Sequence, residues 1–146
     1  MEKLQQKAQQ AKDYFNNLSS RIQNIDARLK DISALQKHIG IYSKTREVYA
    51  GYRKAGYSKK HLAEHEDSIN AHKAAKKYFD SLGLKKLPTI KTLQTEYATL
   101  SAEKKKLYGE YHPARKYMQD ILTAKQNAEQ LLNYRETEKT KESERI

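Results

Sequence analysis

The sequence predicts an all-α protein, an elongated antiparallel coiled coil or helical bundle with three main helices, two long and one short. Helix breakers are rare, with 5 Gly and 2 Pro in 146 residues. The mean hydropathy of -1.03 is low for a spherical core, whereas long helices need only a narrow apolar seam. Apolar residues also recur at alternating spacings of three and four, as in a coiled coil. We expect one helical domain over residues 1–134, with helices at about 2–54, 58–82 and 88–134, and a charged tail at 135–146 that frays.

The first expected helix has a continuous heptad seam. Its apolar residues follow one another at spacings of four and three, which keeps them on one side of a helix. Gly40 and Gly51 weaken the later part of this helix, and Gly56 is placed to end it as a C-terminal cap. The seam residues are Leu4, Ala8, Ala11, Phe15, Leu18, Ile22, Ile25, Leu29 and Ile32.

The other two expected helices have recognisable start and stop signals. Ser58 can cap the middle helix, and Gly83 stops it. Pro88 suits the first position of the third helix. Pro113 lies inside that helix and should kink it without ending it, because the seam keeps its phase across the proline. The middle seam consists of Leu62, His65, Ile69, His72, Lys76 and Phe79, and the third seam continues from Ile90 to Leu132.

The helix lengths predict self-association. At ~1.5 Å per residue the helices span about 78, 36 and 69 Å, so the middle helix covers only half of the first. If the third helix runs parallel to the first, two seams stay uncovered and a homodimer would cover them. Alternatively, the chain bends back at Gly40 and Pro113 into a shorter bundle. The expected self-association seam comprises Leu4, Phe15, Leu18, Ile22, Ile25, Leu29, Met118, Ile121 and Leu132.

The net charge of +11 is concentrated in two blocks. Residues 36–60 and 73–91 are strongly basic, and they flank an acidic segment at 61–72. Such blocks, interleaved with tyrosines, can neutralise phosphates of DNA; the alternative is a solvated helix face that complements helix dipoles. The candidate DNA-binding residues are Lys44, Arg46, Arg53, Lys54, Lys59, Lys60, Lys73, Lys76, Lys77, Lys85 and Lys86.

Catalytic chemistry has little support in the sequence. His61, Glu64 and His65 match the H-x-x-E-H spacing of one group of zinc peptidases, but a catalytic zinc also needs a third ligand and a cleft. We expect instead that His65 and His72 fill the seam while His61 faces solvent. No Cys is present, and no apolar run approaches the ~18 residues of a membrane span. We therefore expect a cytoplasmic chain that is not an enzyme, with no metal, no cofactor and no membrane partner.

Residues 40–132 resemble the C-terminal helical region of relaxases, the mobilisation nucleases of Gram-positive plasmids and integrative conjugative elements. The resemblance implies a non-catalytic accessory domain that dimerises, assists DNA binding or contacts proteins of the conjugation machinery. It carries over no catalytic residue, because the His-hydrophobe-His metal motif of relaxases is not found in this sequence. A coiled-coil module for protein–protein interaction, with no nucleic-acid role, is the alternative. The matching runs are YAGYRKAGY at 49–57, HKAAKK at 72–77, FDSLG at 79–83, KLP at 86–88, TLQTEYATLSAEKKKLYGEY at 92–111 and LTAKQNAEQLL at 122–132.

Overall fold

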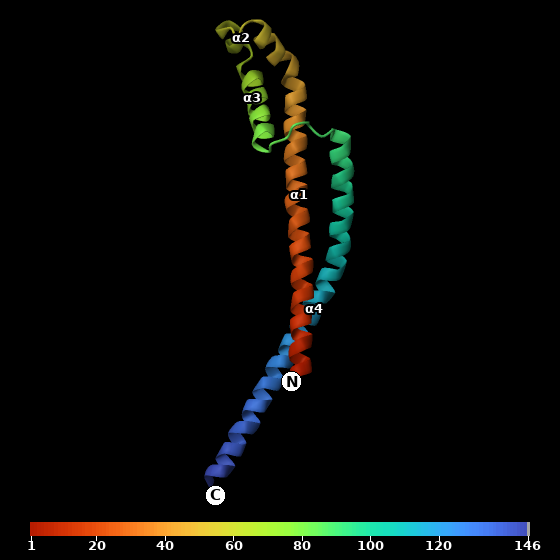
Figure 1. Cartoon of the computed structure of the whole chain (residues 1–146), viewed down its shortest axis with the longest axis vertical. Helices are drawn as coiled ribbons and strands as arrows, with labels where there is room; N and C mark the ends of the chain where they lie inside the picture. Colours follow the sequence, from red (N-terminus) through yellow and green to blue (C-terminus); the bar gives the residue numbers. More distant parts are fainter. Residues whose placement is uncertain (146) are drawn as a thin grey trace. The chain divides into compact units, whose positions relative to one another are not determined.

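The computed structural model describes residues 1–145, with side chains described through residue 144. Four helices make up this part of the chain: α1 (Glu2–Lys54), α2 (Lys59–Glu64), α3 (Glu66–Ser81) and α4 (Ile90–Arg145) (Figure 1). No strand occurs among the described residues, so the predicted all-α class is confirmed. None of the described helices combines the length and the apolar character needed to cross a membrane.

Two glycines end helices as the sequence predicted. Gly56 and Gly83 adopt φ values of 65° and 66°, in the left-handed region that favours glycine. After Gly56, the backbone N–H of Tyr57 donates to the carbonyl oxygen of Tyr52 at 3.0 Å. This bond back over five residues is the Schellman pattern, which satisfies carbonyls that the last helical turn leaves free.

The middle helix expected over residues 58–82 is two helices in the structure. The chain bends at His65, which has φ -130° and ψ 30° and separates α2 from α3. Glu66 and Asp67 form the start of α3, where negative charge is favourable at a helix N-terminus. Because the seam of the expected middle helix is polar, few apolar contacts oppose this break.

α4 differs from the expected 88–134 helix at both ends. The hydroxyl of Thr89 accepts a hydrogen bond from the N–H of Thr92 at 3.1 Å. Thr89 is therefore the N-cap, and the helix begins at Ile90 rather than at the proline. α4 passes through Pro113 and continues to Arg145, so residues 135–145 of the expected frayed tail are helical; residue 146 lies outside the described residues.

The chain forms two compact units, which are described separately. The hairpin unit comprises residues 26–101, and the terminal unit comprises residues 1–25 together with those from 102 onward. In the hairpin unit, α1 packs against α3 and the first part of α4. Its buried core consists of Ile32, Leu35, Ala75, Phe79 and Leu93.

Within the hairpin unit, α4 runs antiparallel to α1. Arg28 donates to Glu96 through two nitrogens, at 2.6 and 3.0 Å, and Leu93 packs in one cluster with Ile32 and Leu35. Later residues of α1 thus meet earlier residues of α4. The expected parallel course of the third helix is wrong. The connection over residues 82–89 crosses α1 before α4 begins (Figure 1), and eight residues can span up to ~26 Å, enough for such a crossing.

The terminal unit is also an antiparallel helix pair. Arg21 lies 3.8 Å from Glu103, and the ring centroids of Phe15 and Tyr111 are 5.0 Å apart. Because α4 covers α1 here, the uncovered first-half seam that predicted a homodimer is not present. Of the expected self-association seam, the chain itself buries Leu18, Ile22 and Ile25, half-buries Leu4, Phe15, Leu29, Met118 and Ile121, and exposes Leu132.

Candidate functional site

The end of the hairpin unit brings the two basic blocks together. α1 ends in the turn at Gly56, α2 and α3 fold back, and α3 then lies along the last part of α1 (Figure 1). Tyr57 follows Gly56 with φ 60°, a strained value for a residue other than glycine. Its ring meets that of Tyr52 edge to face, with centroids 5.2 Å apart, and this contact between the turn and α1 stabilises the turn.

His72 on α3 is the centre of the contact between the two helices. It is 4% exposed, and Thr45 on α1 is 8% exposed. The hydroxyl of Thr45 donates to the carbonyl oxygen of Ile41 at 2.7 Å and lies 2.9 Å from Nδ1 of His72. Since a hydroxyl has one proton, we assign the proton of this second bond to Nδ1, which leaves Nε2 of neutral His72 as an acceptor.

Two tyrosines of α1 hold the imidazole of His72 between them. The rings of Tyr42 and Tyr49 each stack on His72 with centroids 4.4 Å apart, at interplanar angles of 22° and 18°. Burial lowers the pKa of His72 below its ordinary value of 6.5, and the positive charge of Lys76 lowers it further, against a hydrogen bond to the backbone of Tyr42. The imidazole is therefore neutral at pH 7 and packs as an aromatic ring.

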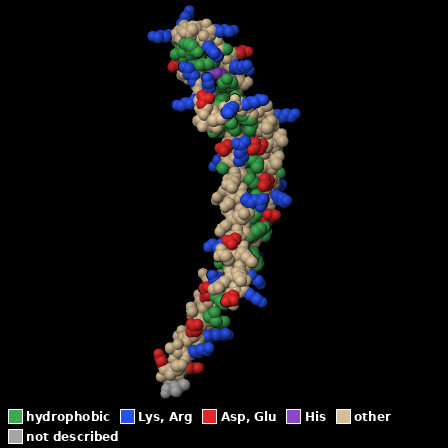
Figure 2. Space-filling model, viewed as in Figure 1, with side chains coloured by type: hydrophobic (Ala, Val, Ile, Leu, Met, Phe, Trp, Pro, Cys, Tyr) green, Lys and Arg blue, Asp and Glu red, His purple; other side chains and the backbone are tan. Residues whose placement is uncertain are grey.

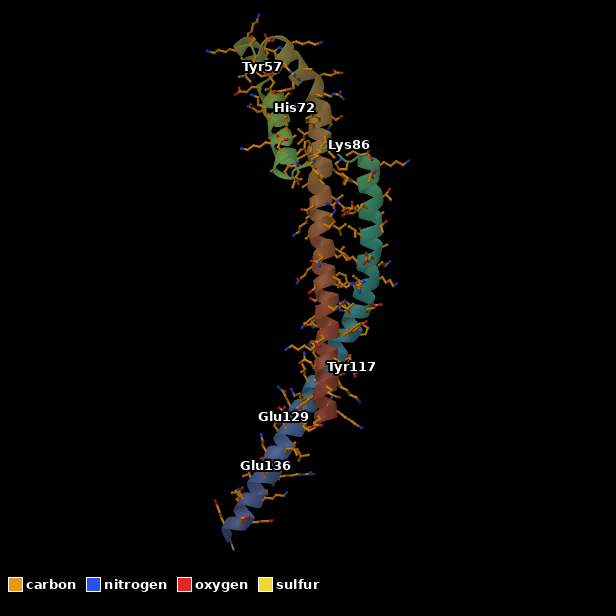
Figure 3. The ribbon with its side chains drawn as sticks, viewed as in Figure 1. Tyr57, His72, Lys86, Tyr117, Glu129 and Glu136 are labelled. Carbon is orange, nitrogen blue, oxygen red and sulfur yellow. The ribbon has the colours of Figure 1, made fainter. Side chains whose placement is uncertain are left out.

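A groove of about 480 Å³ opens beside this aromatic stack. Figure 3 shows His72 between α1 and α3, and in Figure 2 Lys and Arg side chains project around this end of the hairpin unit. Among the described residues, the lining contains four cations and no acid. It consists of Tyr42, Arg46, Tyr49, Ala50, Arg53, Lys54, His72 and Lys76.

The structure gathers some of the candidate DNA-binding residues and leaves others apart. All eleven are exposed, and within the part of the chain that the structure describes none forms an ion pair with an acid. Arg46, Arg53, Lys54 and Lys76 line the groove. The Nζ of Lys73 lies 5.4 Å from the ring centroid of Tyr52. The other candidates lie outside the groove lining: Lys44, Lys59, Lys60, Lys77, Lys85 and Lys86.

Sequence reasoning missed the aromatic floor of the groove. His72 was expected only as a seam residue, and the tyrosines near the basic blocks were expected only to be interleaved with the cations. The available signal was the order of Tyr42, Arg46, Tyr49 and Arg53, which alternates aromatic and cationic side chains at spacings of four, three and four. That spacing places all four on one face of a helix.

The His61–His65 pair differs from its expected arrangement. His65 is exposed, whereas His61 is half-buried and its Nε2 has no hydrogen-bond partner. The ring of His61 rests on α1 because residue 51 is glycine: a Cβ there would lie 3.3 Å from its Cε1 atom. The two imidazoles are 4.8 Å apart, and in the described range no group of three or more His, Cys, Asp or Glu is placed to hold a metal ion.

No family model, curated protein or solved structure matches this chain. The geometry and charge of the groove are therefore the basis on which a function can be inferred.

Proposed function

We propose that the chain is a non-catalytic helical module that binds nucleic acid through its backbone phosphates. The binding surface is the end of the hairpin unit formed by α2, α3 and the last part of α1. The observation that supports it is the cluster of Arg46, Arg53, Lys54 and Lys76 around one groove whose described lining contains no acid. Cations gathered without counter-charges are the arrangement that a polyanion stabilises.

The charge around this groove extends over the whole end of the hairpin unit. Between residues 44 and 86, eleven Lys and Arg face five acids, a net charge of +6. Side-chain nitrogens that have no ion pair within the protein can bind phosphates without first breaking one. Contacts of this kind read no base sequence, so the proposed binding is independent of sequence.

We further propose that the module is an accessory domain of a relaxase-like DNA mobilisation protein. The resemblance of residues 40–132 to relaxase C-terminal regions supports this, and it makes DNA the nucleic acid and proteins of the conjugation machinery further partners. The antiparallel pairing of α1 with α4 in each unit supports a coiled-coil frame in which the hairpin unit carries the binding surface.

Charge reversal of a lysine pair outside the groove tests the proposed function. Lys59 and Lys60 are exposed at the start of α2, and the K59E/K60E variant should bind DNA roughly tenfold more weakly than the wild type. The K7E/K12E variant changes the charge equally at two exposed positions of the terminal unit and should bind as the wild type does. Fluorescence anisotropy with labelled DNA measures both. Undetectable binding of single-stranded and duplex DNA at low salt would refute the proposal.

Protein–protein contact is a second candidate function, favoured by exposed apolar residues near the end of α4. Leu131, Leu132 and Tyr134 are 52%, 42% and 64% exposed, in the stretch between the labelled Glu129 and Glu136 (Figure 3). Self-association through this stretch would bury them and would complete the cover over Met118 and Ile121. Light scattering decides this: a dimer that L131D/L132D dissociates supports it, and a monomer at all concentrations rules out the homodimer.

A further inference from the structure

The shape of the groove restricts what can enter it. Its volume of about 480 Å³ lies within the range of sites for small ligands. A nucleic-acid duplex displays its phosphates on the outside of a wide cylinder, so it can touch the exposed lysines but cannot enter a hollow of this size. A single nucleotide can enter.

The lining supplies both kinds of contact that a nucleotide requires. Arg46 and Arg53 lie two helical turns apart on α1, about 10 Å along its axis, and their guanidinium groups suit bidentate binding of phosphate oxygens. Lys76 contributes a positive charge from α3, on the opposite side of the groove. The half-buried rings of Tyr42 and Tyr49 alternate with the arginines and provide aromatic surface for a base or sugar.

The floor of the groove is held in place before any ligand arrives. Tyr42 and Tyr49 each stack on His72, and His72 is itself held by the hydroxyl of Thr45. Side chains that are already fixed lose little conformational entropy on binding, which favours affinity. The rim, by contrast, is formed by exposed cations that can move to meet an anion.

We propose that the groove between α1 and α3 binds one nucleotide unit, with its phosphate on Arg46, Arg53 and Lys76 and its base or sugar against Tyr42 or Tyr49. The unit is either a free nucleotide or part of an unpaired strand. In the second form the inference rests on the proposed function and adds that single strands bind better than duplex. The free-nucleotide form does not depend on it.

Two matched pairs of variants separate the groove from the rest of the basic surface. Ala50 lines the groove and Ala74 does not, and both are exposed on helices; A50W fills the groove and A74W is its control. Lys76 lines the groove and the adjacent exposed Lys77 does not, so K76Q and K77Q remove the same charge at the two kinds of position. Circular dichroism checks that each variant is helical, and if A50W fails to fold, the lysine pair decides.

The ligands are a labelled twelve-nucleotide deoxythymidine strand, a duplex of the same length and adenosine monophosphate. We expect the wild type to bind the single strand about tenfold more tightly than the duplex. A50W should lose at least tenfold in affinity for the strand and K76Q about fivefold, whereas A74W should stay within twofold of the wild type and K77Q, which removes a cation of the outer surface only, should lose less than K76Q. Binding of adenosine monophosphate with the same sensitivity to A50W identifies a free-nucleotide site, and its failure to bind identifies the unpaired strand.

If A50W binds every ligand with the same affinity as A74W, and K76Q with the same affinity as K77Q, the groove proposal is overturned. Phosphate contact by exposed lysines would still stand in that case. Absence of binding to both the strand and the duplex would overturn the proposed function. In that outcome, adenosine monophosphate alone decides the groove: binding that A50W abolishes supports it, and no binding overturns it.

Discussion

The dependence of strand binding on salt concentration measures how many of the cations contact phosphates. Each phosphate neutralised on a single strand contributes about -0.7 to the slope of the logarithm of affinity against the logarithm of salt concentration. One phosphate held in the groove gives a slope of about -0.7, and separate phosphates on each of the four cations that line the groove would give about -2.8. Raising sodium chloride from about 50 to about 200 mM should then weaken binding about threefold in the first case and ~50-fold in the second.

The same measurement separates the groove from the wider basic surface. If all eleven candidate cations bind phosphates, the slope approaches about -7.7 and affinity falls by more than about 10⁴ over the same range. K76Q should make the slope shallower by up to about 0.7, whereas K77Q should leave it closer to the wild-type value. Glutamine and lysine have side chains of similar length, so the change in slope on substitution reflects the loss of the positive charge.

Fluorescence anisotropy of the labelled twelve-nucleotide strand, titrated at five salt concentrations, gives these slopes directly. A wild-type slope near zero would show that binding neutralises no phosphate of the strand, because no counterions would then be released. Identical slopes together with identical affinities for K76Q and K77Q would show that Lys76 holds no phosphate in the groove. Either of these results refutes the reasoning from the groove lining.

Three further predictions concern the hairpin unit, and urea denaturation followed by circular dichroism measures each. Ile32 is completely buried, so I32A should lower the free energy of unfolding by about 2–5 kcal/mol. Burial and the charge of Lys76 lower the pKa of His72 in the folded state, so the unfolded state binds more protons. The contribution of His72 to the free energy of unfolding should therefore be fully present above pH ~6.5 and be lost as pH falls through the folded-state pKa. The H72Q variant should lack this part of the pH dependence. Gly56 has φ 65°, so G56A should cost about 1 kcal/mol, whereas G40A, in a helix with open space at the added Cβ, should stabilise by about 0.5–1 kcal/mol.

The sequence predicted the helices well because their signals are local. The heptad spacing, the turn glycines and the scarcity of breakers act within a few residues, and the all-α class followed from them. The direction of α4 was not predictable in this way. A connection over residues 82–89 is long enough either to turn back or to cross α1, and contacts distant in the sequence, such as the burial of Leu93 against Ile32 and Leu35, favour the crossing.

The site was predicted in its charge but not in its shape. The basic blocks are visible in the sequence, yet which cations share a groove depends on the pairing of α1 with α3. That pairing is set by the contacts of His72 with Tyr42, Thr45 and Tyr49, which join residues 23 to 30 positions apart. The places expected of His61 and His65 are likewise exchanged: His61 lies against Gly51, and His65, where α2 ends, is exposed.

The position of the groove relative to the core favours a binding role over a stabilising one. The large apolar side chains that hold the hairpin unit together, such as Ile32, Phe79 and Leu93, are buried in a cluster that meets the groove only through Tyr42, which packs against it. Like-charge repulsion opposes the compact state where four cations surround one groove, as Arg46, Arg53, Lys54 and Lys76 do. Sites that break a local stabilising rule while the surrounding packing is sound are commonly functional. An anion in the groove would offset this repulsion, so the same four side chains that weaken the empty hairpin would favour its folded form when a phosphate is bound.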